Sequence, residues 1–413
     1  MNVNLSFYVR IKTMREYNNT DYTCLFGGGA IRGAAHAGVI KCLEELGINP
    51  KTLAGSSVGA MVAMLYAVGY TSEELAEAFL SVNFELFRDI SFGFNQKFAL
   101  SKGEVFLNWL RELIEKKYYG EKYVCGQNPP VKFSDIDKNL IIITTDLHTF
   151  KCKEFSTFET PDYEIAMAVR ISCCMPGLMR AVDIDNKLLV DGDLMKGKPM
   201  WMLSENIKNA ENRLLEIRLE GSFEGSDDSP VEYVNGMYSC MTATETDFIK
   251  NLYENSDKYD YLVINTGNVV VVDFNYPKEK RQAIIDTGYR LAKQYFTEIL
   301  PKKKTIIAEI YSKILDKLRL IYFFMSQKKF IQAKNATAEI FIYLADVRKY
   351  IDKDVYHSIS LFQKFLFCNV KTGLLGRSTC KNSSTIMDSL RAIIKDLEER
   401  ETALKKYISK YSD

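Results

Sequence analysis

The sequence predicts an α/β fold that is followed by a helical C-terminal region. Before Lys278, segments with strand character alternate with segments of helical periodicity, which is the pattern of an α/β sheet. One strand, at residues 140–145, is apolar along most of its length, as expected where helices cover both faces of a sheet. From Lys278 onward the pattern is helical.

The first half of the chain carries start and stop signals for its elements. A strand leads into three glycines, and the helix after them ends at Gly47, a residue suited to a helix C-cap. Thr71 and Glu74 have the spacing of a capping box and open a further helix. The elements expected here are strands at 22–26, 52–54 and 140–145 and helices at 33–46, 58–68, from 71, and 103–117.

The second half continues the alternation. Pro161 is suited to the first turn of a helix, which we expect to run to about Cys173. The pair Asp185-Asn186 between two strand-like stretches predicts a β-hairpin. The strands expected here are the hairpin arms at 180–184 and 187–190 and two more at 214–219 and 261–265.

The composition of the chain limits its function. Its 413 residues carry a net charge of +1, which argues against a general nucleic-acid-binding protein. Nine cysteines without C-x-x-C spacing, and no signal peptide, indicate free thiols in a reducing compartment. Since no apolar stretch approaches the roughly 20 residues of a membrane span, we expect a cytoplasmic or peripheral membrane protein.

The chemistry of the chain centres on residues 53–61, which contain a G-x-S-x-G motif with Ser57 in the middle. A serine on a tight strand-to-helix turn has an exposed hydroxyl, and the helix after it directs N–H groups toward charge developing beside it. Gly55 and Gly59 are needed because a side chain would strike the neighbouring strand or helix. The pattern is that of an acyl-transfer nucleophile, although the motif alone also arises by chance.

A glycine-rich turn at residues 27–33, Gly-Gly-Gly-Ala-Ile-Arg-Gly, directs backbone N–H groups toward an anion. Neither the dinucleotide-binding fingerprint nor the P-loop pattern fits, because Arg32 stands where a third glycine belongs and no Gly-Lys-Ser/Thr follows. We favour an oxyanion hole over a plain tight turn, with Arg32 adding positive charge and fixing the loop. The expected backbone donors are Gly28, Gly29 and Ala30.

A serine nucleophile requires a base. The chain has three histidines, and the residue order of the α/β-hydrolase triad would require His357, from the helical region, to act as the base. We therefore expect structural roles for His36, His148 and His357. Asp191 is the better candidate because it ends an apolar strand and precedes a glycine, close to the sheet edge where Ser57 lies. An ordinary Asp-Gly hairpin turn is the alternative.

Together, these stretches resemble the patatin-like phospholipase family. The similarity covers about residues 20–290, and the matching stretches are residues 28–39, 55–59, 145–147, 168–172, 175–177 and 191–192. The resemblance implies a three-layer α/β/α fold, a Ser-Asp dyad formed by Ser57 and Asp191, and the glycine loop as oxyanion hole. It also implies hydrolysis of acyl esters in phospholipids, in most members without a metal.

Three features depart from the family pattern. Asp193 stands where the family usually has glycine or alanine, and this second carboxylate could raise the pKa of Asp191 or bind a cation. The three glycines stand one position further from Arg32 than in the family. As a result, Ala30 occupies the position of the third glycine of the family's triplet. Residues 196–199, Lys-Gly-Lys-Pro, replace a stretch often rich in asparagine. None of these removes a dyad residue, so we expect an active enzyme.

We expect a serine acyl hydrolase of the phospholipase A or lysophospholipase type, without cofactor or metal, that acts at a membrane surface. The alternatives are a neutral-lipid lipase or acyltransferase using the same site, or a partner-binding module with a vestigial hydrolase fold. The expected organisation is an N-terminal extension (1–20), a patatin-like domain (21–295) and a helical C-terminal domain (296–413).

Two further stretches bear on how a lipid is reached. Residues 84–98 contain five phenylalanines and form either a mobile apolar flap over Ser57 or ordinary core. From Pro301 to the end, 22 Lys and Arg stand against 12 Asp and Glu, a net charge of +10, whereas the rest of the chain carries −9. This region is either a module that docks on an anionic membrane or an acidic protein partner, or a helical bundle with solvated charges.

Overall fold

The computed structural model describes residues 22–82, 101–195, 204–208, 213–221, 259–267, 276–372 and 378–411, together with positions 99, 236 and 269. The chain divides into two compact units, and the main boundary between them falls between Tyr295 and Phe296. The phenylalanine-rich stretch at 84–98 and the Lys-Gly-Lys-Pro stretch at 196–199 lie outside the described residues. Within the described residues, no helix has the length and apolar character needed to cross a membrane.

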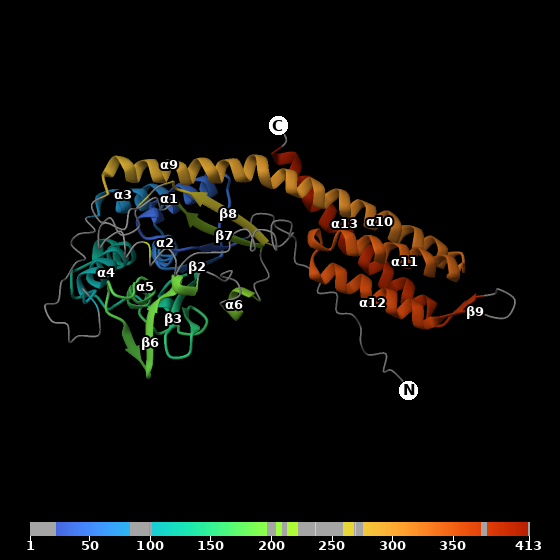
Figure 1. Ribbon diagram of the computed structural model, residues 1–413, viewed down its shortest axis with the longest axis horizontal. Helices are drawn as coiled ribbons and strands as arrows, with labels where there is room; N and C mark the ends of the chain where they lie inside the picture. The colour runs from blue at the N-terminus through green and yellow to red at the C-terminus, as the bar shows by residue number, and fades with distance from the viewer. Residues whose placement is uncertain are drawn as a thin grey trace. The chain divides into compact units, whose positions relative to one another are not determined.

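The first unit contains a mixed sheet with flanking helices, which confirms the predicted α/β class (Figure 1). Its elements are β1 (Tyr22–Phe26), η1 (Ala30–Gly33), α1 (Ala34–Glu45), β2 (Thr52–Ser56), α2 (Val58–Ala67), α3 (Ser72–Ser81), α4 (Glu104–Tyr119), η3 (Gly120–Lys122), η4 (Phe133–Asp135), β3 (Asn139–Asp146), β4 (Lys151–Ser156), α5 (Ile165–Ser172), β5 (Val182–Ile184), β6 (Lys187–Asp191), η5 (Gly192–Met195), α6 (Glu205–Lys208), β7 (Arg213–Glu220), β8 (Tyr259–Asn265) and α9 (Lys278–Gln294).

The strand order of the sheet is β5-β6-β3-β2-β1-β7-β8, and β4 also pairs with β3. Strands β1, β2, β3, β7 and β8 are parallel, whereas β4 and β6 run antiparallel to β3, and β5 antiparallel to β6. The predicted hairpin is therefore present, and it turns at Asp185 and Asn186, which have φ values of 51° and 60°. Asn and Asp accept positive φ more readily than other non-glycine residues, and this suits a two-residue hairpin turn.

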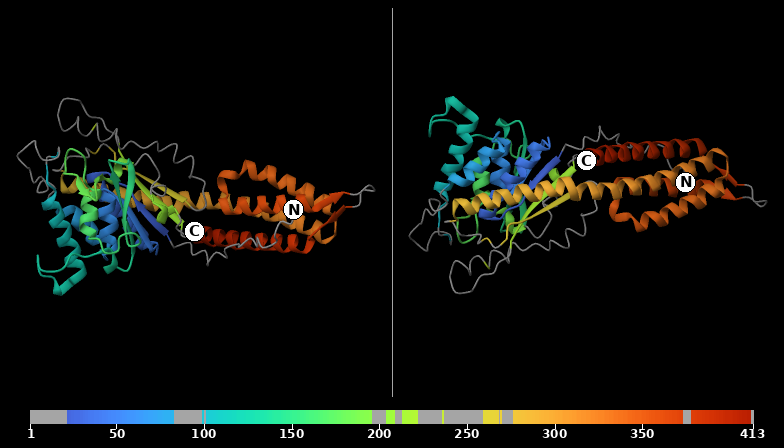
Figure 2. Two further views of the ribbon diagram at one scale, coloured as in Figure 1. Left: turned by 90° about the horizontal axis from the view of Figure 1, so that it is seen from below. Right: turned by 90° about the horizontal axis from the view of Figure 1, so that it is seen from above.

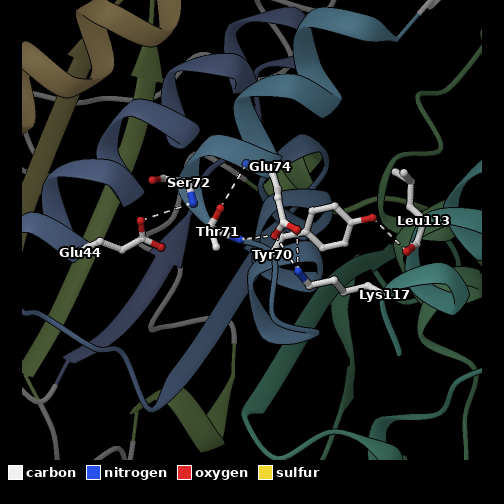
Figure 3. Close-up of polar contacts among 7 residues, drawn as sticks. All are labelled: Glu44, Tyr70, Thr71, Ser72, Glu74, Leu113 and Lys117. Atoms are coloured by element: carbon white, nitrogen blue, oxygen red, sulfur yellow. Dashed lines mark hydrogen bonds and ion pairs between the residues drawn. The ribbon is translucent and has the colours of Figure 1, made fainter. Parts of the chain in front are cut away.

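The capping box predicted before α3 is also confirmed (Figure 3). The Glu74 N–H donates to Thr71 Oγ1 at 3.3 Å, and the Thr71 N–H donates to the Glu74 carboxylate at 2.8 Å. The same carboxylate accepts from Lys117 Nζ of α4 at 2.6 Å, and Tyr70 donates to the Leu113 carbonyl of α4 at 3.0 Å. The cap thus also joins α3 to α4.

Helix α5 begins later than expected, at Ile165 instead of Pro161. The Pro161 carbonyl accepts from the Ser134 N–H and the Tyr163 carbonyl from the Phe133 N–H. These carbonyls are used by the segment that precedes β3, so they are not available for a first helical turn at Pro161.

The second unit is helical, as predicted for the C-terminal region. Its elements are a π-helical turn η7 (Tyr295–Ile299), which begins at the unit boundary, α10 (Leu300–Ser326), α11 (Phe330–Asp346), η8 (Arg348–Tyr350), α12 (Lys353–Asn369), β9 (Val370–Thr372), β10 (Ser378–Cys380) and α13 (Ser383–Lys410). Helices α10 to α13 lie lengthwise against one another around a core of aliphatic side chains (Figure 2). Apolar side chains at helical spacing along α13, among them Ile386, Leu390 and Leu397, face this core.

Candidate active site

Ser57 lies on a sharp turn between β2, which ends at Ser56, and α2, which begins at Val58. Its backbone has φ 52° and ψ −131°. A conformation of this kind costs a non-glycine residue about 1–3 kcal/mol and persists only where the surrounding structure enforces it. The strand-to-helix elbow expected from the sequence is therefore present.

The two flanking glycines are enforced by close backbone contacts. A β-carbon on Gly55 would lie 2.3 Å from the Gly59 carbonyl oxygen, and one on Gly59 would lie 2.0 Å from the Phe26 carbonyl oxygen. Both overlaps are with backbone atoms, which cannot turn aside as a flexible side chain can. The requirement for glycine at both positions, predicted from the sequence, is confirmed.

Ser172, at the end of α5, holds the elbow from the other side. Its hydroxyl accepts a hydrogen bond from the Ser57 N–H at 2.9 Å and donates to the Ile143 carbonyl of β3 at 2.6 Å. The side chain is fully buried. Ser172 lies in one of the stretches that resemble the family, but the sequence predicted no role for it. The reason is that its two partners, Ser57 and Ile143, are 115 and 29 residues away in the chain.

Strand β3 brings Ser57 and Asp191 together. Ser56 of β2 lies opposite Ile143, and Asp191 of β6 lies opposite the next residue, Thr144. Because β4 pairs along residues 141–146 of β3, β2 and β6 must share the opposite edge and meet end to end there. As a result, Ser57 Oγ donates a hydrogen bond to Asp191 Oδ2 at 2.9 Å, between two buried side chains.

The second oxygen of the Asp191 carboxylate is also held. Asp191 Oδ1 accepts from the Asp193 N–H at 2.7 Å, and the Asp191 N–H donates to the Cys174 carbonyl at 2.9 Å. Burial, together with the nearby negative charge of Asp191, raises the pKa of the Cys173 thiol well above its usual value. A neutral thiol is a poor nucleophile.

The glycine loop differs from expectation at its first donor. The Gly28 N–H donates to Asp193 Oδ1 at 3.1 Å, so this N–H is already used within the site. The physical reason is the carboxylate side chain at position 193, where a glycine or alanine would offer no acceptor. Ala30 has a positive φ of 46° and begins the short helix η1, so the chain turns sharply within the loop.

Arg32 lies in the same loop, and its guanidinium anchors it. Its Nη2 donates to the Val269 carbonyl at 2.9 Å, and a β-carbon on Gly221 would lie 2.8 Å from the guanidinium carbon. Both contacts are with residues that follow β7 and β8. They correspond to the expected role of Arg32 in fixing the loop.

The histidines occupy positions that suit structural roles. His36 Nε2 lies 2.8 Å from the Gly27 carbonyl oxygen, and its ring packs edge-on against Phe26. His148 Nδ1 lies 2.8 Å from the Asn186 carbonyl oxygen, which joins the end of β3 to the hairpin. His357 belongs to α12 in the second unit.

The suggested cation site at Asp193 has no supporting cluster in the part of the chain that the structure describes. There, no group of three or more His, Cys, Asp and Glu side chains is arranged to hold a metal ion. The Asp193 carboxylate instead accepts from protein donors, the Gly28 N–H and the Ser56 hydroxyl.

Comparison with known proteins identifies similar sequences and a similar fold. Residues 25–203 match the model of the patatin-like phospholipase family. An uncharacterised protein of Acanthamoeba polyphaga mimivirus, R571, is 24% identical over 288 residues, which cover 66% of this chain and 93% of that protein. A segment of 43 residues is 51% identical to lysophospholipase nte1 of Aspergillus fumigatus and covers 10% of this chain and 3% of that protein. The crystal structure of VipD from Legionella pneumophila is similar with a TM-score of 0.50 and 16% identity, and covers 93% of this chain and 92% of that chain.

Proposed function

We propose that the chain is a serine acyl hydrolase of the phospholipase A or lysophospholipase type, in the patatin-like phospholipase family whose model matches residues 25–203. The observation that carries the proposal is the 2.9 Å hydrogen bond from Ser57 Oγ to Asp191 Oδ2 at a strained strand-to-helix elbow. Residues 21–295 form the catalytic domain in this proposal, and residues 296–413 form a separate helical domain.

In the first half of the reaction, Ser57 Oγ attacks the carbonyl carbon of the lipid ester while its proton moves to Asp191 Oδ2. The hydrogen bond between the two groups gives the proton a direct path. The tetrahedral intermediate then collapses, the alcohol of the lipid takes the proton from Asp191, and the acyl group remains on Ser57.

In the second half, water attacks the acyl-enzyme and gives its proton to Asp191, which returns it to Ser57 as the fatty acid leaves. The negative charge that develops on the carbonyl oxygen requires N–H donors in fixed positions. Since Gly28 donates to Asp193, we assign the oxyanion to the N–H groups of Gly29 and Ala30, with the N-terminus of α2 adding favourable dipole.

A lipid substrate is supported by the family and by the similar 43-residue segment of a protein named a lysophospholipase. The second unit supports action at a membrane surface. Residues 317–338 and 355–387 contain no Asp or Glu, and both segments reach the end of the helical bundle that carries β9 (Figure 1).

We define the basic tip as the lysines at this end with the exposed apolar side chains among them. Lys334 of α11 lies over the ring of Phe367 of α12, with 4.7 Å from Nζ to the ring centroid, which brings the two segments together. The basic tip comprises Lys328, Lys329, Lys334, Lys364, Lys371, Lys381, Phe323, Ile331 and Phe367. The lysines can contact the anionic headgroups of a membrane, while the exposed apolar side chains among them enter the boundary between headgroups and acyl chains. We therefore propose that the basic tip docks the enzyme on its substrate membrane.

The test is acyl release from fluorogenic phospholipid and lysophospholipid vesicles by the full chain. We expect Ser57→Ala and Asp191→Asn each to lower kcat by at least about 1,000-fold, since each removes one half of the dyad. Ser81→Ala and Asp183→Asn, at exposed positions of the same unit, serve as matched controls. Undiminished acyl release by both dyad variants would refute the assignment.

The product mixture separates the hydrolase from the other enzyme candidates. A hydrolase releases free fatty acid even when glycerol or lysolipid is added, whereas an acyltransferase moves the acyl group to the added acceptor. A neutral-lipid lipase would cleave triacylglycerol emulsions in preference to phospholipid vesicles.

A further inference from the structure

Asp193 occupies a central position in the site. Asp193 lies two residues after Asp191, in the short helix η5. The side chain is 1% exposed, and a buried carboxylate is costly unless donors and positive charge surround it.

Three hydrogen bonds connect Asp193 to three different parts of the site. Its Oδ1 accepts from the Gly28 N–H at 3.1 Å and from the Ser56 hydroxyl at 3.2 Å. Its own N–H donates to Asp191 Oδ1 at 2.7 Å. Asp193 therefore links the glycine loop, the strand before the nucleophile and the base.

The Asp193 carboxylate occupies the space that a side chain at position 28 would need. A β-carbon there would lie 2.5 Å from Asp193 Cγ and within 2.8 Å of both carboxylate oxygens. The carboxylate thus lies directly against the loop backbone, so the position of the loop depends on the side chain at position 193.

A buried arginine also lies against the glycine loop. The Arg218 side chain is 1% exposed and pairs with Glu216 of the same strand at 2.5 Å. A β-carbon on Gly27 would lie 3.2 Å from Arg218 Cδ, so this arginine lies against the loop beside Gly28. Burial lowers the pKa of Arg218, but the nearby Glu216, Tyr261 and Asp193 raise it above its usual value, so the guanidinium stays charged beside the loop.

We infer that Asp193 is a positioning residue, which fixes the glycine loop against the elbow and leaves the next N–H groups of the loop to hold the oxyanion. The inference rests on the proposed function for its effect on turnover. Its effect on the loop does not depend on that function. What the side chain supplies is an acceptor at Oδ1, so an amide of the same shape should replace it.

The first experiment compares turnover in Asp193→Ala and Asp193→Asn. We expect the alanine variant to lose about 10- to 100-fold in kcat with little change in KM, because a displaced donor loop weakens binding of the transition state alone. The asparagine variant retains the acceptor and should recover most of that loss. Ser56→Ala, which removes one of the two donors to Oδ1, should fall between them, and Asp183→Ala is the control at an exposed position.

The second experiment measures hydrogen–deuterium exchange in peptides that cover residues 27–33. Exchange there should be faster in Asp193→Ala than in the wild type and unchanged in Asp193→Asn, while peptides from α4 should exchange equally in all variants. Wild-type exchange and kcat in Asp193→Ala would overturn the inference, as would an equal loss in both variants. If the wild type releases no acyl group, the proposed function fails, and loop exchange still decides the role of Asp193.

Discussion

At Gly59, the β-carbon of any other residue would lie 2.0 Å from the Phe26 carbonyl oxygen and 2.7 Å from that of Gly27. The first turn of α2 is therefore pressed against the end of β1, and this contact holds Ser57 in its strained conformation. Gly47 provides a contrast, because its φ is positive at 69° but a β-carbon added there would have no atom within 4 Å.

We predict that Gly59→Ala lowers the free energy of unfolding by about 3 kcal/mol or more, the upper end of the range for an overpacked core. Gly47→Ala should cost only about 1 kcal/mol, from backbone conformation alone. Urea denaturation followed by circular dichroism measures both. Equal losses in the two variants would show that the contact with Phe26 is not the constraint.

Single residues also mark the limit of what the sequence predicts. Structural roles for His36 and His148 were predicted from residue order and from the scarcity of histidine, and the contacts of both rings suit such roles. The bond between Asp193 and Gly28 was not predicted, because 165 residues separate its two ends. Asp193 was recognisable in the sequence as a departure from the family pattern, but its partner depends on the packing of η5 against the glycine loop.

Among the elements, those with local signals were predicted and those without were not. The α3 cap and the hairpin turn are encoded within a few adjacent residues. Strand β4, Lys-Cys-Lys-Glu-Phe-Ser, lacks an apolar run and was missed. The sequence predicted that Asp191 lies near Ser57, but it did not predict the strand arrangement that brings them together. Strand β6 runs antiparallel to β3, and its last residue, Asp191, meets the end of β2.

The basic tip is the element on which the membrane proposal depends. We predict that combined Lys328→Glu, Lys329→Glu and Lys371→Glu substitutions weaken binding to phosphatidylserine-containing vesicles by at least about 100-fold at low salt, at roughly 1 kcal/mol per lysine. Cosedimentation with these vesicles, and with vesicles of phosphatidylcholine alone, at low and high salt measures the effect.

A matched control reverses the same number of charges elsewhere in the helical unit. Lys302, Lys313 and Lys406 are exposed and lie outside the basic tip, and their combined replacement by Glu should reduce binding far less. Equal losses in both triple variants would assign the attraction to net charge. Unchanged binding in the basic-tip variant would remove the membrane role from this end of the bundle.

At the scale of the whole molecule, the two units differ in fold and in charge. The alternation of strands and helices predicted the sheet of the first unit, and helical periodicity predicted the second. The net charge of +10 after residue 300, against −9 before it, is one of the observations behind the proposed division of tasks between catalysis and membrane attachment. The chemistry of the first unit can be tested apart from the attachment of the second.

The central claim is that Ser57 is activated by Asp191, and covalent labelling with a fluorophosphonate probe tests it most directly, because the probe needs no membrane and reacts only with an activated serine. Intact-mass analysis of the wild type should show one adduct, which peptide mapping places on Ser57. Ser57→Ala should carry none, and Asp191→Asn should react at least about 100-fold more slowly. An adduct that persists on Ser57→Ala, or a wild-type rate in Asp191→Asn, would contradict the account.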